Sequence, residues 1–245
     1  MKDTVLSFGL QYVIYGLEVC VIAALFWRAR WKRLTSPFLY VIWLAAIDIL
    51  ARPYMFHHYG LNSKVYAYFY WLSDVALALA AFALVGAFFR RACESEERMW
   101  RFLRLLLSFI FILVLGISSF TLLRNYDHLF TTFIYEFGQN LYFTCLVLNT
   151  LLYLLMQQLE STDDELGLLV CGMGIQFAGP AACLALLYLT SGQHYAKSLI
   201  GLISPLCTFG MLVTWLYAVV HVPPPEVLRA GENVPALANA SVPRS

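Results

Sequence analysis

The sequence predicts an all-α membrane protein: a bundle of seven transmembrane helices with the N-terminus outside and the C-terminus in the cytoplasm. Hydrophobic residues make up 61% of the 245 residues and charged residues only 13%, against about 25% charged in a typical soluble domain. The apolar segments follow one another almost from end to end, and the basic residues gather in alternate gaps between them. Together these observations indicate a chain surrounded by lipid.

Seven apolar segments are each long enough to cross the hydrocarbon core, which takes about 20 residues of helix. Lipid offers the backbone no hydrogen-bond partners, so each segment is expected to be helical. The segments are 4–27, 36–56, 65–89, 102–123, 129–156, 166–190 and 198–221. The gaps are short, so residues 1–221 are expected to form one transmembrane domain.

The two ends of the chain differ in composition from the segments between them. The first segment is longer than a signal peptide, and its basic cluster follows it instead of preceding it, so we interpret 4–27 as a mature span. Residues 222–245 are rich in proline and in small or polar residues. They are expected to form a disordered cytoplasmic tail.

The basic residues set the expected orientation. Five of the sixteen lysines and arginines lie toward one side, and eleven lie toward the other, which the positive-inside rule assigns to the cytoplasm. Those eleven are Arg28, Arg30, Lys32, Arg33, Arg90, Arg91, Arg98, Arg101, Arg104, Arg229 and Arg244. The predicted location is the inner (cytoplasmic) membrane, which the chain crosses several times. The acidic loop 160–165 and the basic loop 90–104 are both expected on the cytoplasmic side. Solvated loops are the default, with mutual pairing or a docked partner as alternatives.

Prolines interrupt three of the predicted spans. Pro53 follows Arg52 and is expected to loosen the outer end of span 36–56, while Pro180 and Pro205 lie inside the last two spans. Each removes one helix hydrogen bond and permits a bend. The two late prolines fit either fixed packing features or moving hinges.

Four acidic residues lie inside predicted spans, where an ionisable group is expensive and therefore a candidate functional site. At about 1.5 Å per residue, Asp48, Asp74 and Glu136 lie about 10–14 Å below the outer ends of their helices, and Glu18 lies deeper, at about 20 Å. The first three acids therefore share one level and can line one cavity.

The neighbours of these acids share their helix faces. Asp48 and Arg52 are four residues apart and can pair, and two tyrosines repeat at the same spacing before Asp74. The candidate ligand-binding residues are Asp48, Arg52, Tyr66, Tyr70, Asp74, Glu136 and Asn140. Two interpretations remain open. One is an outward-facing aromatic and acidic pocket, and the other is polar side chains that join packed helices.

Histidine and cysteine point to no cofactor. His57, His58, His128 and His194 fall in outer loops without a ligand motif, so solvated loop histidines are favoured over a metal or pH-sensing site. The six cysteines include no CxxC pair and are expected to be small buried hydrophobes. No metal and no cofactor are predicted.

One segment carries a family resemblance. Residues 66–91, YAYFYWLSDVALALAAFALVGAFFRR, open with tyrosines and a tryptophan, continue with a Ser–acid pair and end in a long aliphatic run. This pattern resembles the third span of a group of bacterial seven-helix membrane proteins to which no activity is assigned. The short loops and the proline in a late helix fit the same group. The resemblance implies the architecture and no activity.

The expected function is that of a small sensor, receptor-like or accessory membrane protein with an outward-facing pocket. Membrane lipid, a small apolar ligand, and a cytoplasmic or membrane protein are the expected partners; nucleic acid is not. An enzyme is not expected, because the chain shows no catalytic constellation. Retinal is not expected either, because the middle of the last span holds Ser204, Pro205 and Thr208 where a microbial rhodopsin has its Schiff-base lysine. The alternative is a small-solute or proton-coupled transporter, favoured by the intramembrane acids and the prolines.

Overall fold

The computed structural model describes residues 2–28, 30–60, 63–94, 97–124, 129–159, 163–189 and 194–222. All regular structure within these ranges is helical, as the sequence predicts. The predicted tail 222–245 lies outside the described residues except for Val222. The helices are α1 (Lys2–Trp27), the short 3-10 turn η1 (Arg30–Lys32), α2 (Thr35–Ala45), η2 (Ala46–Ala51), α3 (Arg52–Tyr59), α4 (Lys64–Ala92), α5 (Glu97–Arg124), α6 (Leu129–Gln158), α7 (Asp164–Leu189) and α8 (His194–His221).

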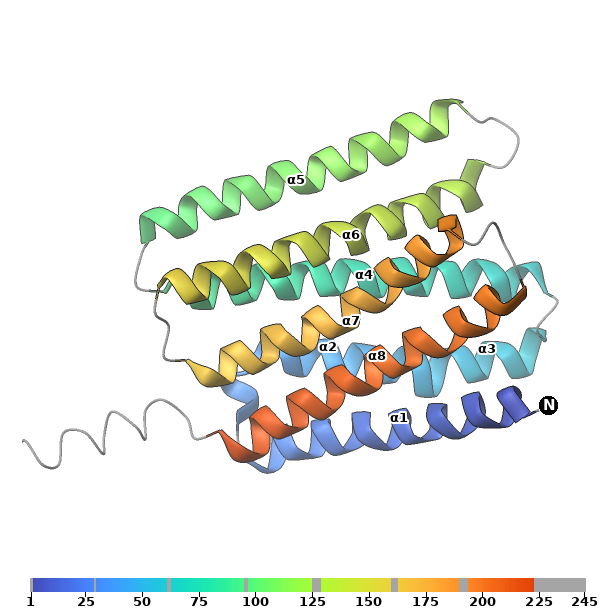
Figure 1. Ribbon diagram of the computed structural model, residues 1–245, viewed down its shortest axis with the longest axis horizontal. Coiled ribbons are helices and arrows are strands. Elements are labelled where there is room, and N and C mark those ends of the chain that lie inside the picture. The colour runs from blue at the N-terminus through green and yellow to red at the C-terminus, as the bar shows by residue number, and fades with distance from the viewer. Residues whose placement is uncertain are drawn as a thin grey trace, which may run out of the picture.

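The long helices lie lengthwise and alternate in direction, so that α1 begins at one end of the bundle and α8 ends at the other (Figure 1). Within the described residues, six helices are long and apolar enough to cross a membrane: Gly9–Trp27, Thr35–Tyr59, Lys64–Ala92, Glu97–Ser119, Phe137–Gln158 and Ile203–His221. These helices support a membrane-embedded protein. Since α7 is not among the six, the count of seven spans stays a prediction, as does the orientation.

The second predicted span is continuous from Thr35 to Tyr59 but changes its helical geometry near its middle. Between α2 and α3, residues 46–51 form a π-helical segment in which the Arg52 N–H bonds to the Ile47 carbonyl, five residues back. Pro53 follows at once; it has no N–H, and its ring crowds the carbonyl four residues earlier. The widened turn accommodates the proline, and the helix then continues to Tyr59. The predicted disturbance at Pro53 is therefore a π segment, and both α7 and α8 also continue past their prolines.

Helix α8 packs closely on α7 and α1 around one buried tryptophan. Trp215 is 1% exposed, donates a hydrogen bond from Nε1 to the Leu169 carbonyl at 3.0 Å, and contacts Tyr40 of α2 edge-on. Gly172 lies directly beneath its ring. Small residues let membrane helices approach closely, and here the missing side chain of Gly172 makes room for the indole.

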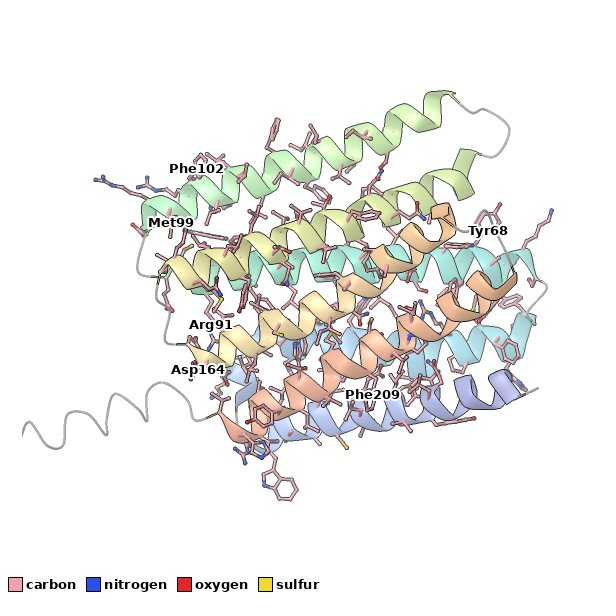
Figure 2. The ribbon with its side chains drawn as sticks, viewed as in Figure 1. Tyr68, Arg91, Met99, Phe102, Asp164 and Phe209 are labelled. Carbon is pink, nitrogen blue, oxygen red and sulfur yellow. The ribbon has the colours of Figure 1, made fainter. Side chains whose placement is uncertain are left out.

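Helix α5 lies at the edge of the bundle and packs against α6 and α4 (Figure 1). Its outer face carries exposed apolar side chains, including Phe102, Phe109 and Ile112; Figure 2 shows Phe102 pointing away from the bundle. In an embedded protein such a face contacts lipid.

A group of four charged residues, the Arg91 cluster, joins three elements at one end of the bundle. Arg91, at the end of α4, contacts Asp163 at 2.7 Å and Glu165 at 2.9 Å, and Arg33 contacts Glu165 at 3.2 Å. Asp163 also caps α7 by accepting the Leu166 N–H. Figure 2 shows Arg91 beside the start of α7. The default expectation of solvated loops is therefore wrong at these residues. The Glu165 side chain is fully buried, so it requires its arginine partners.

We expect Gly172→Ala to lower the free energy of unfolding by about 1–3 kcal/mol, the usual cost of forcing an extra methyl group into a packed core. A Cβ at Gly172 would lie 2.6 Å from the Trp215 ring. Gly167→Ala, on the same helix, is the matched control, since nothing lies within 4 Å of a Cβ there. Thermal unfolding in detergent measures both variants, and equal midpoints would contradict this packing.

Candidate functional site

Arg52 is held between two carboxylates contributed by different helices. Its Nη1 lies 2.7 Å from Asp48 Oδ1, one helical turn back, so the predicted pair is formed. Its Nη2 lies 3.8 Å from Asp74 Oδ1 on α4 and donates to Ser73 Oγ at 3.4 Å. The π segment η2 carries Asp48 and ends at Arg52, and such segments occur often at functional sites.

Tyr70 completes this group on the α4 side. The Arg52 guanidinium lies 4.6 Å from the centre of the Tyr70 ring, within cation–π range. Ser73 donates a hydrogen bond to the Tyr70 carbonyl at 2.8 Å, which fixes its hydroxyl beside Arg52. We call Asp48, Arg52, Tyr70, Ser73 and Asp74 the Arg52 cluster.

The predicted shared face of α4 points toward α3. Tyr66, one turn before Tyr70, contacts Phe56 of α3 edge-on with ring centres 6.1 Å apart. Tyr70 and Asp74 contact Arg52 as described. The tyrosines and the acid therefore line the contact between α3 and α4, as their spacing of four residues indicates.

Burial changes across the Arg52 cluster. Asp48 is 7% exposed, and the side chain of Arg52 is 20% exposed, whereas the side chain of Asp74 is 38% exposed and Tyr70 is 39% exposed. Asp48 is thus an internal counter-charge. Asp74 and Tyr70 are open to a molecule that approaches from outside the bundle.

Glu18 on α1 is the residue that sequence reasoning left out of the site. It is fully buried and lies within electrostatic range of both Asp48 and Arg52. Neither of its carboxyl oxygens has a hydrogen-bond partner among the described residues, and the same holds for Arg52 Nε. Because α3 extends to Tyr59, Asp48 lies about 16 Å from that helix end, deeper than a span ending at residue 56 implied. That greater depth is consistent with Asp48 lying near Glu18.

The two predicted site residues on α6 are not part of the described Arg52 cluster. Asn140 donates from Nδ2 to Ser118 Oγ on α5 at 3.2 Å, so it joins two helices. Asn149, lower on α6, does the same by donating to the Val170 carbonyl of α7. The side chain of Glu136 lies outside the described residues, and its predicted place in the site remains a prediction.

Metal binding is not indicated by the part of the chain that the structure describes. No three histidine, cysteine, aspartate or glutamate side chains come together there in a way that could hold a metal ion. His57 and His58 are exposed at the end of α3, where His58 stacks on Tyr54. The side chains of His128 and His194 lie outside the described residues.

The Arg52 cluster and Glu18 together place three carboxyl groups around one guanidinium. One positive charge can balance one carboxylate, so the arrangement favours an additional positive charge, supplied either by a proton or by a cationic group. Tyr70 adds an aromatic surface beside the accessible carboxyl group of Asp74. This combination of acid and aromatic surface suits a small molecule with an apolar body and a polar or cationic head.

Asp48→Asn is expected to lower the free energy of unfolding by about 2 kcal/mol, because it removes a buried, charge-assisted hydrogen bond to Arg52. Asp74→Asn should cost less than about 1 kcal/mol, since its contact is longer and more exposed. Thermal unfolding of both variants in the same detergent gives the comparison. A larger loss for Asp74→Asn would show that the two acids have been ranked incorrectly.

No family model matches the chain, and neither a curated protein nor a solved structure matches it.

Proposed function

We propose that the chain is a small receptor-like sensor of the inner (cytoplasmic) membrane that binds a small, mostly apolar molecule at the Arg52 cluster. The strongest support for the proposal is the exposure of Tyr70 and Asp74. Each is more than a third exposed, and each contacts the largely buried Arg52. An ion pair that only joined helices would not need the accessible carboxyl group and ring.

Helix α4 connects this site to the Arg91 cluster. It carries Tyr70 and Asp74 toward one end and Arg91 at the other, about 26 Å away along the helix axis. A shift of α4 on ligand binding would change the contacts of Arg91 with Asp163 and Glu165. A separate protein partner that contacts this end of the bundle would then read the signal.

The proposal places seven spans in the membrane, with the N-terminus outside and the Arg91 cluster in the cytoplasm. It rests on the distribution of basic residues and on the alternating direction of the helices (Figure 1). Lys2→Cys and Ser245→Cys, each in a background without the six native cysteines, test this orientation. An impermeant maleimide should label the first in intact cells and the second only after permeabilisation. Labelling of both from one side would contradict an odd number of spans.

Native mass spectrometry of the detergent-purified protein tests the ligand. We expect the parent protein to carry a co-purified small molecule, and Tyr70→Leu and Asp74→Asn to lose most of it. Phe109→Leu on the lipid-facing side of α5 is the control and should keep it. Equal occupancy in all the variants, or no bound molecule in the parent, would contradict a ligand site at the Arg52 cluster.

The second candidate function is a proton-coupled transporter. The excess of carboxyl groups around Arg52 favours it, because intramembrane acids often mark ion and substrate pathways. The identified ligand distinguishes the two functions. In proteoliposomes a transporter moves that molecule across the membrane when a proton gradient is applied, whereas a sensor binds it without moving it.

A further inference from the structure

We propose that Glu18 is a proton-binding site, with its carboxyl group neutral in the folded protein at neutral pH. The site is built by α1 and by the Asp48–Arg52 pair of the neighbouring span. The inference does not depend on a ligand at the Arg52 cluster, so it stands or falls separately from the proposed function.

Glu18 is completely enclosed by the bundle. The residue is 0% exposed, and both carboxyl oxygens lack a hydrogen-bond partner among the described residues. An isolated carboxylate in an apolar interior costs far more than a neutral carboxyl group, so such a group takes up a proton when nothing pairs with it. A proton needs only the carboxyl group itself, whereas a metal ion needs several ligands. No described group of side chains supplies such a set of ligands.

The cation within electrostatic range of Glu18 is Arg52, and it already contacts two other acids. Arg52 bonds to Asp48 at 2.7 Å and contacts Asp74 at 3.8 Å. If all three acids were ionised, a single guanidinium would face three negative charges. Asp74 is 38% exposed at its side chain and contacts Arg52, and Asp48 has the short bond, whereas Glu18 is fully enclosed and has neither. Glu18 is therefore the acid that holds the proton.

The other groups around Glu18 do not change this assignment. Tyr15 on the same helix already bonds to Gln11, and Tyr40 of α2 is neutral at neutral pH. Helix α8 also packs on α1, and between Ile203 and Val220 its sequence has no acidic, basic or histidine residue. Its titratable groups there are Cys207 and Tyr217, which supply no positive charge.

Release of this proton would change the balance around Arg52. The O–H bond of the carboxyl group breaks, the proton passes to water, and the negative charge remains on Glu18. The buried Arg52 Nε has no partner among the described residues, so the guanidinium has a free donor for the new carboxylate. Proton loss would then draw Arg52 toward Glu18 and weaken its longer contact with Asp74.

Infrared difference spectroscopy of the full chain in lipid nanodiscs tests the proposal, because a protonated carboxyl group has its own C=O stretching band. At neutral pH the parent should show this band. Glu18→Gln should lack it, and Asp74→Asn, the matched control, should retain it. An identical band in the parent and in Glu18→Gln would show that Glu18 is ionised and would overturn the proposal.

Stability against pH gives a second, independent readout. A folded state that keeps a proton that the unfolded chain releases loses stability as the pH rises. The thermal midpoint of the parent should therefore fall toward alkaline pH more steeply than that of Glu18→Gln, which stays neutral at every pH. The two proteins should unfold at similar temperatures only below about pH 4.3, where glutamate is protonated in the unfolded chain as well. At neutral pH Glu18→Gln should be the more stable of the two, because only the parent can release a proton on unfolding. A strongly destabilised Glu18→Gln with an unchanged pH slope would contradict a neutral Glu18.

Discussion

The contacts of Arg52 are the interaction on which the arrangement of the candidate site depends. A guanidinium inside an apolar bundle cannot lose its proton, so the protein must supply acceptors for it. Asp48 provides a short bond from the same span, and Asp74 provides a second carboxylate from α4. These contacts fix the rotation of α4 against α3, and they bring Tyr70 over the guanidinium. The geometry of the site follows from balancing one buried positive charge.

The helices could be predicted because an embedded chain must satisfy its backbone internally and must match the thickness of the membrane. The ends of the helices were less predictable, since apolar sequence marks the hydrocarbon core and not the end of the hydrogen bonding. Helix α4 starts at Lys64 because Ser63 caps it by accepting the Val65 N–H. The π segment at 46–51 was also missed, although Pro53 marked the place where the α-helix is disturbed.

The site was predictable where one helix determined it. The Asp48–Arg52 pair follows from a spacing of four residues, and the common direction of Tyr70 and Asp74 follows from the same rule. Relations between helices were not predictable from a single sequence, because hydrophobicity does not specify how each helix is rotated. The contact of Asn140 with Ser118 of α5, instead of with the Arg52 cluster, was not predictable for this reason. Helix lengths alone predict Glu18 too deep in the membrane to lie beside Asp48. The true difference in depth depends on the height of α1 relative to the second span, which the sequence does not specify.

The Arg91 cluster and the Arg52 cluster differ in the balance between their positive and negative charges. In the Arg91 cluster two arginines face two acids, and both acids have arginine contacts. That balanced arrangement suits a fixed connection between elements. Around Arg52 the acids outnumber the described cation, and one of them, Glu18, is buried with no hydrogen-bond partner among the described residues. An unbalanced group of this kind is a cost to stability unless it binds something. The excess acid is the reason for proposing the ligand site and the proton site on the Arg52 side, and α4 extends from there to the balanced Arg91 cluster.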